Sequence, residues 1–215
     1  MEIIKFNLKG DWRDLDDYII ERAVSVIKKG GSIVYPTDTV YGLGVDALRI
    51  ESIRRLFRIK RRPETKPIPV MVRDIIMAHQ LAFIDKEKEK ILKAVWPGAI
   101  TVVLEKREIV PSLLTAGKKT IGLRISDHPF TRFLMNKLEI PLTATSANFS
   151  GEPSLTSSLE VIKTFEKVYP QPDLILDAGD LPVNQPSTVL DLSGSHPRIL
   201  RIGPVSKREL EKILG

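Results

Sequence analysis

Short apolar runs alternate with amphipathic stretches along the whole chain. Runs rich in Val, Ile, Leu and Thr predict strands, and they cover residues 3–7, 32–35, 68–72, 99–104, 120–125, 141–145, 173–176, 187–192 and 199–202. Stretches with apolar residues three or four positions apart predict helices, and they cover residues 14–29, 50–59, 74–81, 85–95, 129–138, 157–168 and the segment after Ser206. This irregular alternation predicts an α/β fold, a twisted mixed sheet with flanking helices.

Several predicted helices carry capping signals at their ends. Asp14 can cap the first helix, and Gly30 can close it. The helices that begin near Ser157 and Ser206 each have a Glu three positions after the Ser, which is the spacing of a capping box. We therefore expect both serines to bond the backbone of the first helical turn.

Composition narrows the class of protein. The 215 residues are 42% hydrophobic, which suits one domain over residues 1–215 with a sizeable core. The chain has no Cys, which excludes disulfides, thiolate metal sites and a Cys nucleophile. No apolar run is long enough to span a bilayer, and the first residues lack a signal-peptide pattern, so we expect a cytoplasmic protein with no membrane partner. Lys and Arg exceed Asp and Glu by 33 to 27, which favours anionic partners such as a nucleotide or RNA.

The stretch from Gly30 to Gly44 is the centre of the functional hypothesis. A buried strand over residues 32–35 should end at Pro36, which has no N–H for a neighbouring strand. Thr37, Asp38 and Thr39 follow at once, and a polar rim at a strand end is where α/β sheets bind ligands. Gly42 and Gly44 would allow close backbone approach or positive φ. A surface turn rich in Thr and Asp is the alternative interpretation.

A basic loop follows the helix predicted over residues 50–59. Pro63 favours an extended conformation at Arg62, and in an extended segment Lys60 and Arg62 point the same way. Lys66 lies close behind them in sequence. Converged cations without carboxylate partners repel each other, so an anion is expected between them. A solvated basic loop remains the alternative.

Other polar residues lie at predicted strand ends. Residues 145–148 place hydroxyl and amide groups after a strand, where they can bind phosphate oxygens or cap a turn. Arg124 ends its strand and can clamp a carboxylate in two-pronged fashion or pair with an Asp or Glu. Ser187 and Thr188 begin a strand with two hydroxyls.

Common catalytic motifs are absent from the sequence. There is no Gly-x-x-x-x-Gly-Lys-Ser/Thr, Gly-x-Gly-x-x-Gly or Gly-x-Ser-x-Gly. His79, His128 and His196 are far apart and unaccompanied, so each is expected to be a surface or packing residue. Hydrolytic triads and zinc chemistry are therefore poorly supported.

Taken together, these stretches resemble the YrdC-like family, the threonylcarbamoyl-AMP synthases. The motifs that carry the resemblance follow the family's order from about residue 10 to the C-terminus. They are Pro36-Thr37-Asp38-Thr39-Val40-Tyr41-Gly42-Leu43, Lys60-x-Arg62-Pro63, Trp96-Pro97-Gly98, Gly122-Leu123-Arg124, Ser146-Ala147-Asn148 with Ser150-Gly151, Ser187-Thr188-Val189, and Leu200-Arg201 with Gly203. Longer members carry an extra C-terminal domain, and the length of this chain predicts the single-domain form.

The resemblance implies a twisted α/β sheet curved around a positively charged cavity. It implies a nucleotidyltransferase reaction in which L-threonine, bicarbonate and ATP, with Mg²⁺, give threonylcarbamoyl-AMP and pyrophosphate. Downstream proteins would then use the product to modify a tRNA adenosine. The resemblance also implies binding of tRNA or double-stranded RNA as a second property.

The family's functional residues carry over onto matching positions of this sequence. Around threonine the resemblance places Thr39, Arg124, Ala144 and Ser187. Around ATP it places Arg62, Lys66, Thr120, Ser146, Ser154 and Arg201. Catalysis would rest on Lys60, Arg62, Ser146 and Asn148, with Lys60 and Asn148 facing the phosphates or Mg²⁺, whose ligands the sequence leaves unknown.

Two departures and two alternatives accompany this assignment. Met71 stands where some members have a His near threonine. Pro69 interrupts the strand over residues 68–72, which predicts an edge or bulged strand. The alternatives are an RNA-binding module without chemistry, and a paralogue of the YciO type or a carbamoyl-transfer domain with a different acceptor. The Lys60-x-Arg62 spacing and residues 146–148 favour the synthase over the YciO type.

Overall fold

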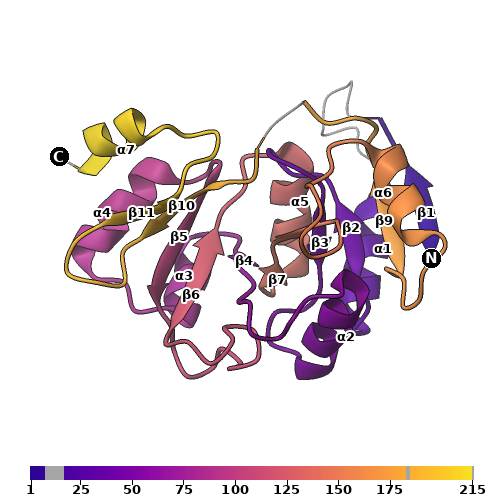
Figure 1. Ribbon diagram of the computed structural model, residues 1–215, viewed down its shortest axis with the longest axis horizontal. Helices are drawn as coiled ribbons and strands as arrows, with labels where there is room; N and C mark the ends of the chain where they lie inside the picture. Colours follow the sequence, from indigo (N-terminus) through magenta and orange to yellow (C-terminus); the bar gives the residue numbers. More distant parts are fainter. Residues whose placement is uncertain (8–16, 183–184, 215) are drawn as a thin grey trace.

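The strands of the chain form two sheets that lie side by side (Figure 1). The computed structural model describes residues 1–7, 17–182 and 185–214. The five-stranded sheet has the order β1 (Glu2–Lys5), β9 (Leu174–Asp177), β2 (Ile33–Tyr35), β3 (Gly42–Gly44) and β8 (Thr145–Ser146). The six-stranded sheet has the order β11 (Arg198–Arg201), β10 (Thr188–Asp191), β5 (Ile100–Glu105), β6 (Thr120–Arg124), β4 (Val70–Met71) and β7 (Leu142–Thr143). Each sheet contains parallel and antiparallel pairs, so the predicted mixed α/β fold is confirmed, with its strands divided between two sheets.

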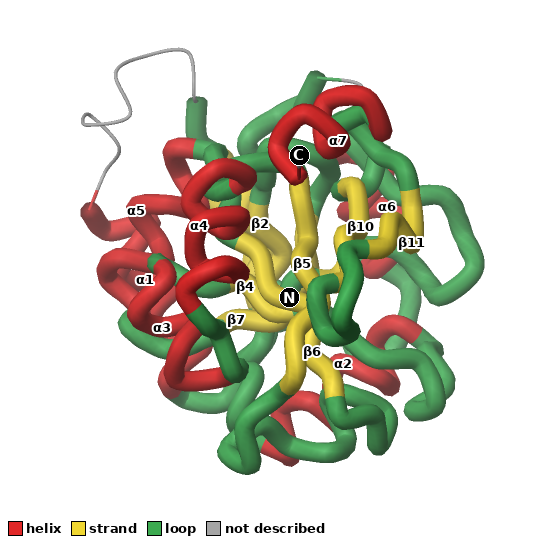
Figure 2. The backbone as a smooth tube through the Cα atoms, turned by 90° about the vertical axis from the view of Figure 1, so that its left-hand side faces the viewer, coloured by secondary structure: helices red, strands yellow, loops and turns green. Residues whose placement is uncertain are grey.

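Helices flank both sides of the strands. They are α1 (Asp17–Lys28), α2 (Ile50–Lys60), α3 (Ile75–Leu81), α4 (Lys86–Val95), α5 (Pro129–Leu138), α6 (Ser158–Phe165) and α7 (Lys207–Leu214). In Figure 2, α1, α3, α4 and α5 gather on one side of the strands, and α2 and α6 lie on the other. The strands are thereby covered by the amphipathic stretches that the sequence pattern predicts.

The capping predictions had mixed outcomes. The box at Ser206 is confirmed, because the Glu209 carboxylate accepts from the Ser206 N–H at 2.8 Å and the Glu209 N–H donates back to Ser206 Oγ. The box at Ser157 is wrong: Ser157 is the N-cap of α6, but its side chain makes no capping bond. This helix also ends at Phe165, short of the predicted 168. The cap proposed at Asp14 lies outside the described residues.

The chain crosses from one sheet to the other at Ala144. A single strand was predicted over residues 141–145, and that prediction is wrong. β7 pairs with β4 in the six-stranded sheet, whereas β8 pairs with β3 in the five-stranded sheet. Ala144 lies between the two strands, and its N–H donates to the Pro69 carbonyl at 2.8 Å. Side chains from both sheets therefore meet around this position.

The strand that contains Pro69 is an interior strand. β4 lies between β6 and β7, so the predicted edge or bulged strand is wrong. The pairing covers Val70 and Met71 alone. Because Pro69 precedes the paired residues, its missing N–H removes no bond from the ladder.

Strand β3 was not predicted, because its sequence is Gly-Leu-Gly. The Tyr35 ring packs over both glycines: a Cβ on Gly42 would lie 2.9 Å from Tyr35 Cζ, and a Cβ on Gly44 would lie 2.8 Å from Leu142 Cγ. Neither glycine has positive φ, so close approach is the reason for glycine here. Beyond them the Tyr35 hydroxyl donates to the Thr143 carbonyl at 3.1 Å, which links the two sheets. Burial raises the pKa of Tyr35 far above its usual range, so the hydroxyl stays neutral.

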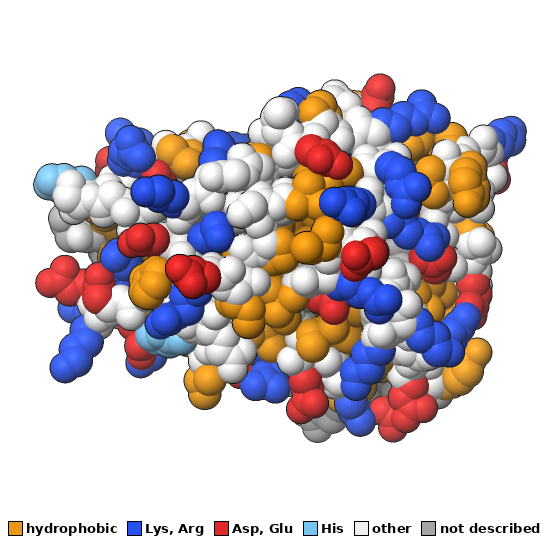
Figure 3. All heavy atoms as spheres, turned by 90° about the horizontal axis from the view of Figure 1, so that it is seen from below, with side chains coloured by type: hydrophobic (Ala, Val, Ile, Leu, Met, Phe, Trp, Pro, Cys, Tyr) orange, Lys and Arg blue, Asp and Glu red, His pale blue; other side chains and the backbone are white. Residues whose placement is uncertain are grey.

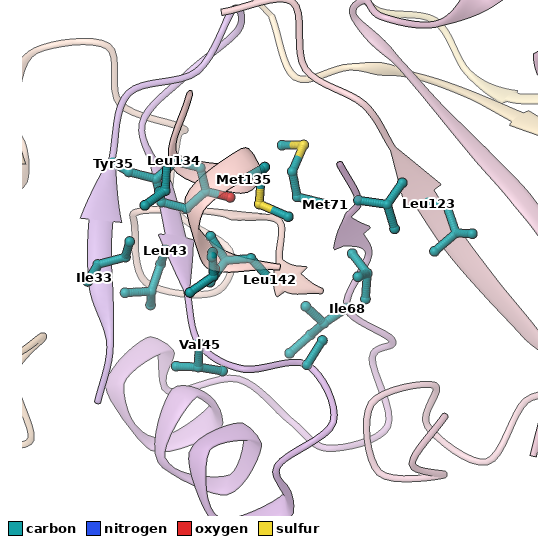
Figure 4. Close-up of a cluster of buried hydrophobic side chains, with 14 of the residues drawn as sticks. Ile33, Tyr35, Leu43, Val45, Ile68, Met71, Leu123, Leu134, Met135 and Leu142 are labelled. Carbon is teal, nitrogen blue, oxygen red and sulfur yellow. The ribbon is translucent and has the colours of Figure 1, made fainter. Parts of the chain in front are cut away.

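One continuous core joins the sheets. Figure 4 shows Ile33 and Leu43 from the five-stranded sheet and Leu123 from the six-stranded sheet, with Leu134 and other α5 side chains between them. These side chains are fully buried. Burial of apolar area at this junction provides most of the attraction that holds the sheets together.

The last residue of α2 is a buried lysine. Lys60 is 1% exposed, and its Nζ donates to the backbone carbonyls of Ser146 and Asn148, the latter at 2.8 Å. Arg61 follows in the left-handed conformation, so the predicted extended segment from Lys60 to Arg62 is wrong. Burial, with a smaller contribution from the Arg62 charge, lowers the pKa of Lys60 to about 7.

The glycine at 44 can be tested against a glycine that touches nothing. Gly44→Ala should destabilise the protein by about 1–3 kcal/mol, because the new methyl group overlaps Tyr35 and Leu142 in a packed core. Gly194→Ala is the matched control, since a Cβ there has no neighbour within 4 Å. Urea unfolding of both variants measures the difference. Equal stability of the two variants would show that Tyr35 does not need the space.

The buried charge of Lys60 should make stability depend on pH. The unfolded chain binds more protons than the folded chain between pH 7 and the ordinary lysine pKa of 10.5, so unfolding free energy rises with pH in that window. Relative to Lys60→Met, the wild type should gain up to about 1.4 kcal/mol per pH unit as the pH is raised. Urea unfolding of both proteins at several pH values measures the gain. A difference that stays constant with pH would contradict a lowered pKa.

Candidate functional site

A cavity of about 190 Å³ lies where the two sheets meet. Its walls come from the end of β2 and the loop after it, from the loop after α2, from β4 and β6, and from the crossing between β7 and β8. The residues that line it are Tyr35, Thr37, Thr39, Val40, Tyr41, Gly42, Arg62, Pro69, Met71, Arg124, Ala144, Thr145, Ser146, Ser154, Pro186, Ser187 and Arg201.

The loop after β2 is both a threonine-capped turn and a wall of the cavity. Thr37 Oγ1 accepts from the Thr39 N–H at 3.1 Å and donates to the Val40 carbonyl at 2.7 Å. The same atom lies 3.0 Å from Thr39 Oγ1, so the two hydroxyls are linked. The turn and the ligand-binding rim were alternatives at the sequence level, and the structure shows that this turn lines the cavity.

Arg124 is fixed from three directions. Its Nη1 donates to Thr39 Oγ1 at 3.0 Å, and its Nε donates to the Gly98 carbonyl at 3.2 Å. Its Nη2 lies 2.7 Å from Asp38 Oδ1 in an ion pair that is largely buried. Asp38 is held in turn by the hydroxyl of Ser126. A guanidinium with its orientation set in this way is suited to bind a planar carboxylate.

Two further arginines face the cavity, and backbone oxygens hold them. Arg201 donates through Nε and Nη2 to the Ser187 carbonyl, at 3.0 and 2.7 Å. Arg62 donates to the carbonyls of Pro67 at 2.8 Å and Lys66 at 3.2 Å. Within the described ranges neither arginine forms an ion pair with a carboxylate. Burial lowers the pKa of both side chains, and the Arg124 charge lowers that of Arg201 further, so an anion between them would be stabilised.

A second cavity, of about 470 Å³, adjoins the first over the open face of the six-stranded sheet. Arg62, Pro69 and Arg201 line both cavities and therefore lie at their boundary. The second cavity is lined by Thr101 of β5 and Thr120 of β6, among others. Thr101 Oγ1 lies 2.7 Å from Ser187 Oγ in the first cavity, so hydroxyls connect the two.

The structure brings most of the predicted site residues together. The first cavity contains Thr39, Arg62, Arg124, Ala144, Ser146, Ser154, Ser187 and Arg201. Thr120 lines the second cavity.

Three predicted residues lie elsewhere. Lys66 is exposed in the loop after α2 and lines neither cavity. Lys60 and Asn148 are buried and line neither cavity, which differs from the predicted position facing phosphates. The Asn148 amide donates to the carbonyls of Phe149 at 3.0 Å and Glu152 at 2.6 Å, so it closes the turn that follows Ser146.

Sequence reasoning did not assign a role to several residues of the site. Asp38 pairs with Arg124, and its signal was present as the one carboxylate in the stretch between two threonines. Thr101 was hidden in the predicted apolar strand 99–104, where its signal was a hydroxyl among apolar neighbours. Tyr35 and Tyr41 line the cavity, and no local pattern distinguished them from core residues.

No group of three His, Asp or Glu in residues 1–7, 17–182 and 185–214 is arranged to hold a metal ion.

No described helix combines the length and apolar character needed to cross a membrane. On the face shown in Figure 3, Lys and Arg side chains are interspersed with Asp and Glu to either side of an apolar band.

Comparison with known proteins gives concordant matches. A family model named Sua5_yciO_yrdC and described as "Telomere recombination" matches residues 25–203. The chain is 36% identical over 202 residues to threonylcarbamoyl-AMP synthase of Pyrococcus abyssi, covering 94% of this chain and 58% of that protein. The chain therefore spans less than two thirds of that relative's length.

Solved structures agree. The crystal structure of P. abyssi Sua5 complexed with L-threonine superposes with a TM-score of 0.91 at 35% identity, covering 100% of this chain and 61% of the other. Escherichia coli YciO superposes with a TM-score of 0.82 at 30% identity, covering 97% and 98% of the two chains. On the match over residues 25–203, the chain belongs to the Sua5/YciO/YrdC family.

Proposed function

We propose that this protein makes threonylcarbamoyl-AMP and pyrophosphate from L-threonine, bicarbonate and ATP. The observation that carries the proposal is the boundary between the two cavities. Arg62 is half-buried and Arg201 more exposed, and both are bonded to backbone oxygens there, with no carboxylate partner among the described residues. The complex of P. abyssi Sua5 with L-threonine supports the choice of amino acid.

The amino acid would occupy the first cavity. Arg124 would hold the threonine carboxylate, because Thr39 and Asp38 already fix the orientation of its guanidinium. Ala144 would leave room for the threonine side chain. Thr39 and Ser187 would supply hydroxyls around the amine and the side-chain hydroxyl.

The nucleotide would span the boundary of the cavities. Arg62 and Arg201 would bind phosphate oxygens, and Ser146 and Ser154 would donate hydroxyl hydrogen bonds from the opposite wall. Thr120 would contact the part of ATP that extends into the second cavity. Lys66, on the exposed loop, would approach the phosphates at the cavity mouth.

The reaction needs no nucleophile from the protein. The threonine amine attacks the carbon of bicarbonate, and water leaves to give a carbamate. A carbamate oxygen then attacks the α-phosphorus of ATP, and the bond from that phosphorus to the bridging oxygen of pyrophosphate breaks. The protein must orient the reactants and neutralise phosphate charge, a role that suits arginines and hydroxyls.

Mg²⁺ would enter with ATP. Mg²⁺ in nucleotide sites is held by phosphate oxygens, waters and one or two carboxylates. Asp38 lies in the loop after β2, but its Oδ1 is engaged by Arg124 and Ser126. Asp191 of the second cavity is engaged by Ser193 and Arg198. The donor set of the described residues therefore fits a metal carried mainly by the ATP phosphates.

The product would serve tRNA modification. Threonylcarbamoyl-AMP is a mixed anhydride of a carbamate and a phosphate, so its carbonyl is activated for transfer to an amine. We propose that downstream proteins transfer the threonylcarbamoyl group to a tRNA adenosine. Whether this chain itself contacts tRNA is a separate hypothesis, which its positive net charge motivates; unchanged affinity for a short RNA duplex at two salt concentrations would contradict it.

Pyrophosphate release with different amino acids tests the proposed reaction. Threonine should be the best substrate, serine poor but detectable, and valine nearly inert, because a site that bonds a hydroxyl strongly rejects its absence. Arg124→Lys should weaken use of the amino acid more than ATP binding, since an ammonium cannot reproduce a two-pronged grip. Arg73→Lys is the matched control, because Arg73 pairs with Asp74 and lines neither cavity. Equal rates with valine and threonine would refute this threonine pocket.

A second variant tests the phosphate site. Arg62→Ala should lower kcat/KM for ATP about 10- to 100-fold, as expected for the loss of one charge-assisted hydrogen bond. Arg58→Ala is its control, because Arg58 is an exposed arginine in the last turn of α2. Steady-state kinetics with ATP varied at saturating threonine give both values. If Arg62→Ala and Arg58→Ala behave alike, Arg62 does not bind phosphate.

A further inference from the structure

Lys60 and the turn after β8 form an arrangement that the reaction described above does not use directly. β8 pairs with β3 through Thr145 and Ser146, and beyond Ser146 a single further backbone bond, from the Ala147 N–H to the Tyr41 carbonyl at 2.8 Å, ties the chain to that side. Yet Ser146 must present its side chain to the cavity from this last paired position. A short strand end of this kind needs support from outside the sheet.

The C-terminal end of α2 supplies that support. The ammonium of Lys60 bonds the carbonyls of Ser146 and Asn148, and Asn148 Oδ1 lies 3.4 Å from the same Nζ. The Lys60 carbonyl accepts from the Ser150 N–H at 2.8 Å. On the outer side, the Arg61 guanidinium lies 4.4 Å from the centroid of the Phe149 ring. The end of α2 therefore contacts the turn on its inner side through Lys60 and on its outer side through Arg61.

The geometry leaves Lys60 no route to a ligand. Its side chain is 1% exposed and lines neither cavity. In its protonated form Lys60 has three donors, and the three acceptors around Nζ account for all of them. Arg62, two residues later, is the cation of this segment that reaches the cavity.

We infer that Lys60 is a positioning residue, which holds the backbone from Ser146 to Asn148 so that Ser146 faces the nucleotide, and that it does not contact the nucleotide itself. The inference has a catalytic half, that Ser146 faces the nucleotide, and this half rests on the proposed function. Its structural half, that Lys60 holds the turn after β8 in place, is independent of what the cavity binds.

Hydrogen exchange tests the structural half on the full chain. In Lys60→Met the backbone N–H groups of residues 145–151 should exchange at least tenfold faster than in the wild type, because the turn loses its support. Lys28→Met is the matched control, since Lys28 is an exposed lysine in the last turn of α1. Lys60→Gln, which keeps a donor, should give an intermediate rate and replaces Lys60→Met if the latter does not fold. Unchanged exchange over residues 145–151 in either folded Lys60 variant would overturn the inference.

A double-mutant cycle tests the catalytic half. Lys60→Met and Ser146→Ala should each lower kcat/KM for ATP about 10- to 100-fold, and the double variant should be no worse than the poorer single one, because Lys60 acts through Ser146. Losses that multiply would mean an independent contact of Lys60 with the nucleotide and would overturn the inference.

The two proposals fail in distinguishable ways. If the wild type releases no pyrophosphate with threonine, the proposed function fails, and the affinity of the same single and double variants for ATP is measured by calorimetry instead. If the double variant binds ATP no more weakly than the poorer single variant, the positioning role is supported. If the two losses of affinity multiply in the double variant, the inference is overturned. The hydrogen-exchange result stands in either case.

Discussion

The site depends on a cluster of positive charges, two of them buried, with very little negative charge beside it. Lys60, Arg62, Arg124 and Arg201 converge on one region, and among them Arg124 alone has a carboxylate partner within the described residues, Asp38. Burial of an unpaired cation is costly unless hydrogen bonds replace its water. Backbone carbonyls supply those hydrogen bonds here. A carbonyl that accepts from one of these cations is not paired in a helix or sheet, so the chain is irregular at that point. The conformation of the loops around the cavity therefore depends on the cations that their carbonyls bind.

The two-sheet arrangement explains how residues distant in sequence reach one cavity. The Tyr35 ring crosses the glycines of β3, and its hydroxyl donates to the Thr143 carbonyl, which links the five-stranded sheet to the six-stranded sheet. Thr39, in the loop between β2 and β3 of the five-stranded sheet, meets Arg124 of β6 in the six-stranded sheet at 3.0 Å. The relative position of the sheets thus sets the geometry of the amino-acid pocket.

Sequence alone predicted the elements that have a strong local signal. The amphipathic helices, the end of β2 at Pro36 and the capping box at Ser206 all depend on neighbouring residues, and all were confirmed. The box at Ser157 failed despite its local signal, and the other errors arose where tertiary contacts decide the outcome. The crossing at Ala144 has no local signal, because residues on both sides of it are suited to a strand.

The same distinction holds for the site. Most of the site residues that the family resemblance implied do line the cavities, and several of them lie at strand ends, where side chains of neighbouring strands meet. The motifs could not predict that Lys60 is buried, since a basic residue before Arg-Arg-Pro also fits a solvated loop. Whether helix α2 continues through Lys60 depends on the turn that it packs against, which begins 86 residues further along the chain.

The position of Ala144 links substrate specificity to folding stability, two properties that could otherwise change independently. Its side chain lines the cavity, and its backbone is the point at which the chain leaves one sheet for the other. A larger residue there would reduce the room for a substrate side chain and also press on the seam between the sheets. Selection for a different substrate at this position therefore acts on folding stability at the same time, so mutational paths to a new specificity are expected to begin elsewhere in the cavity wall.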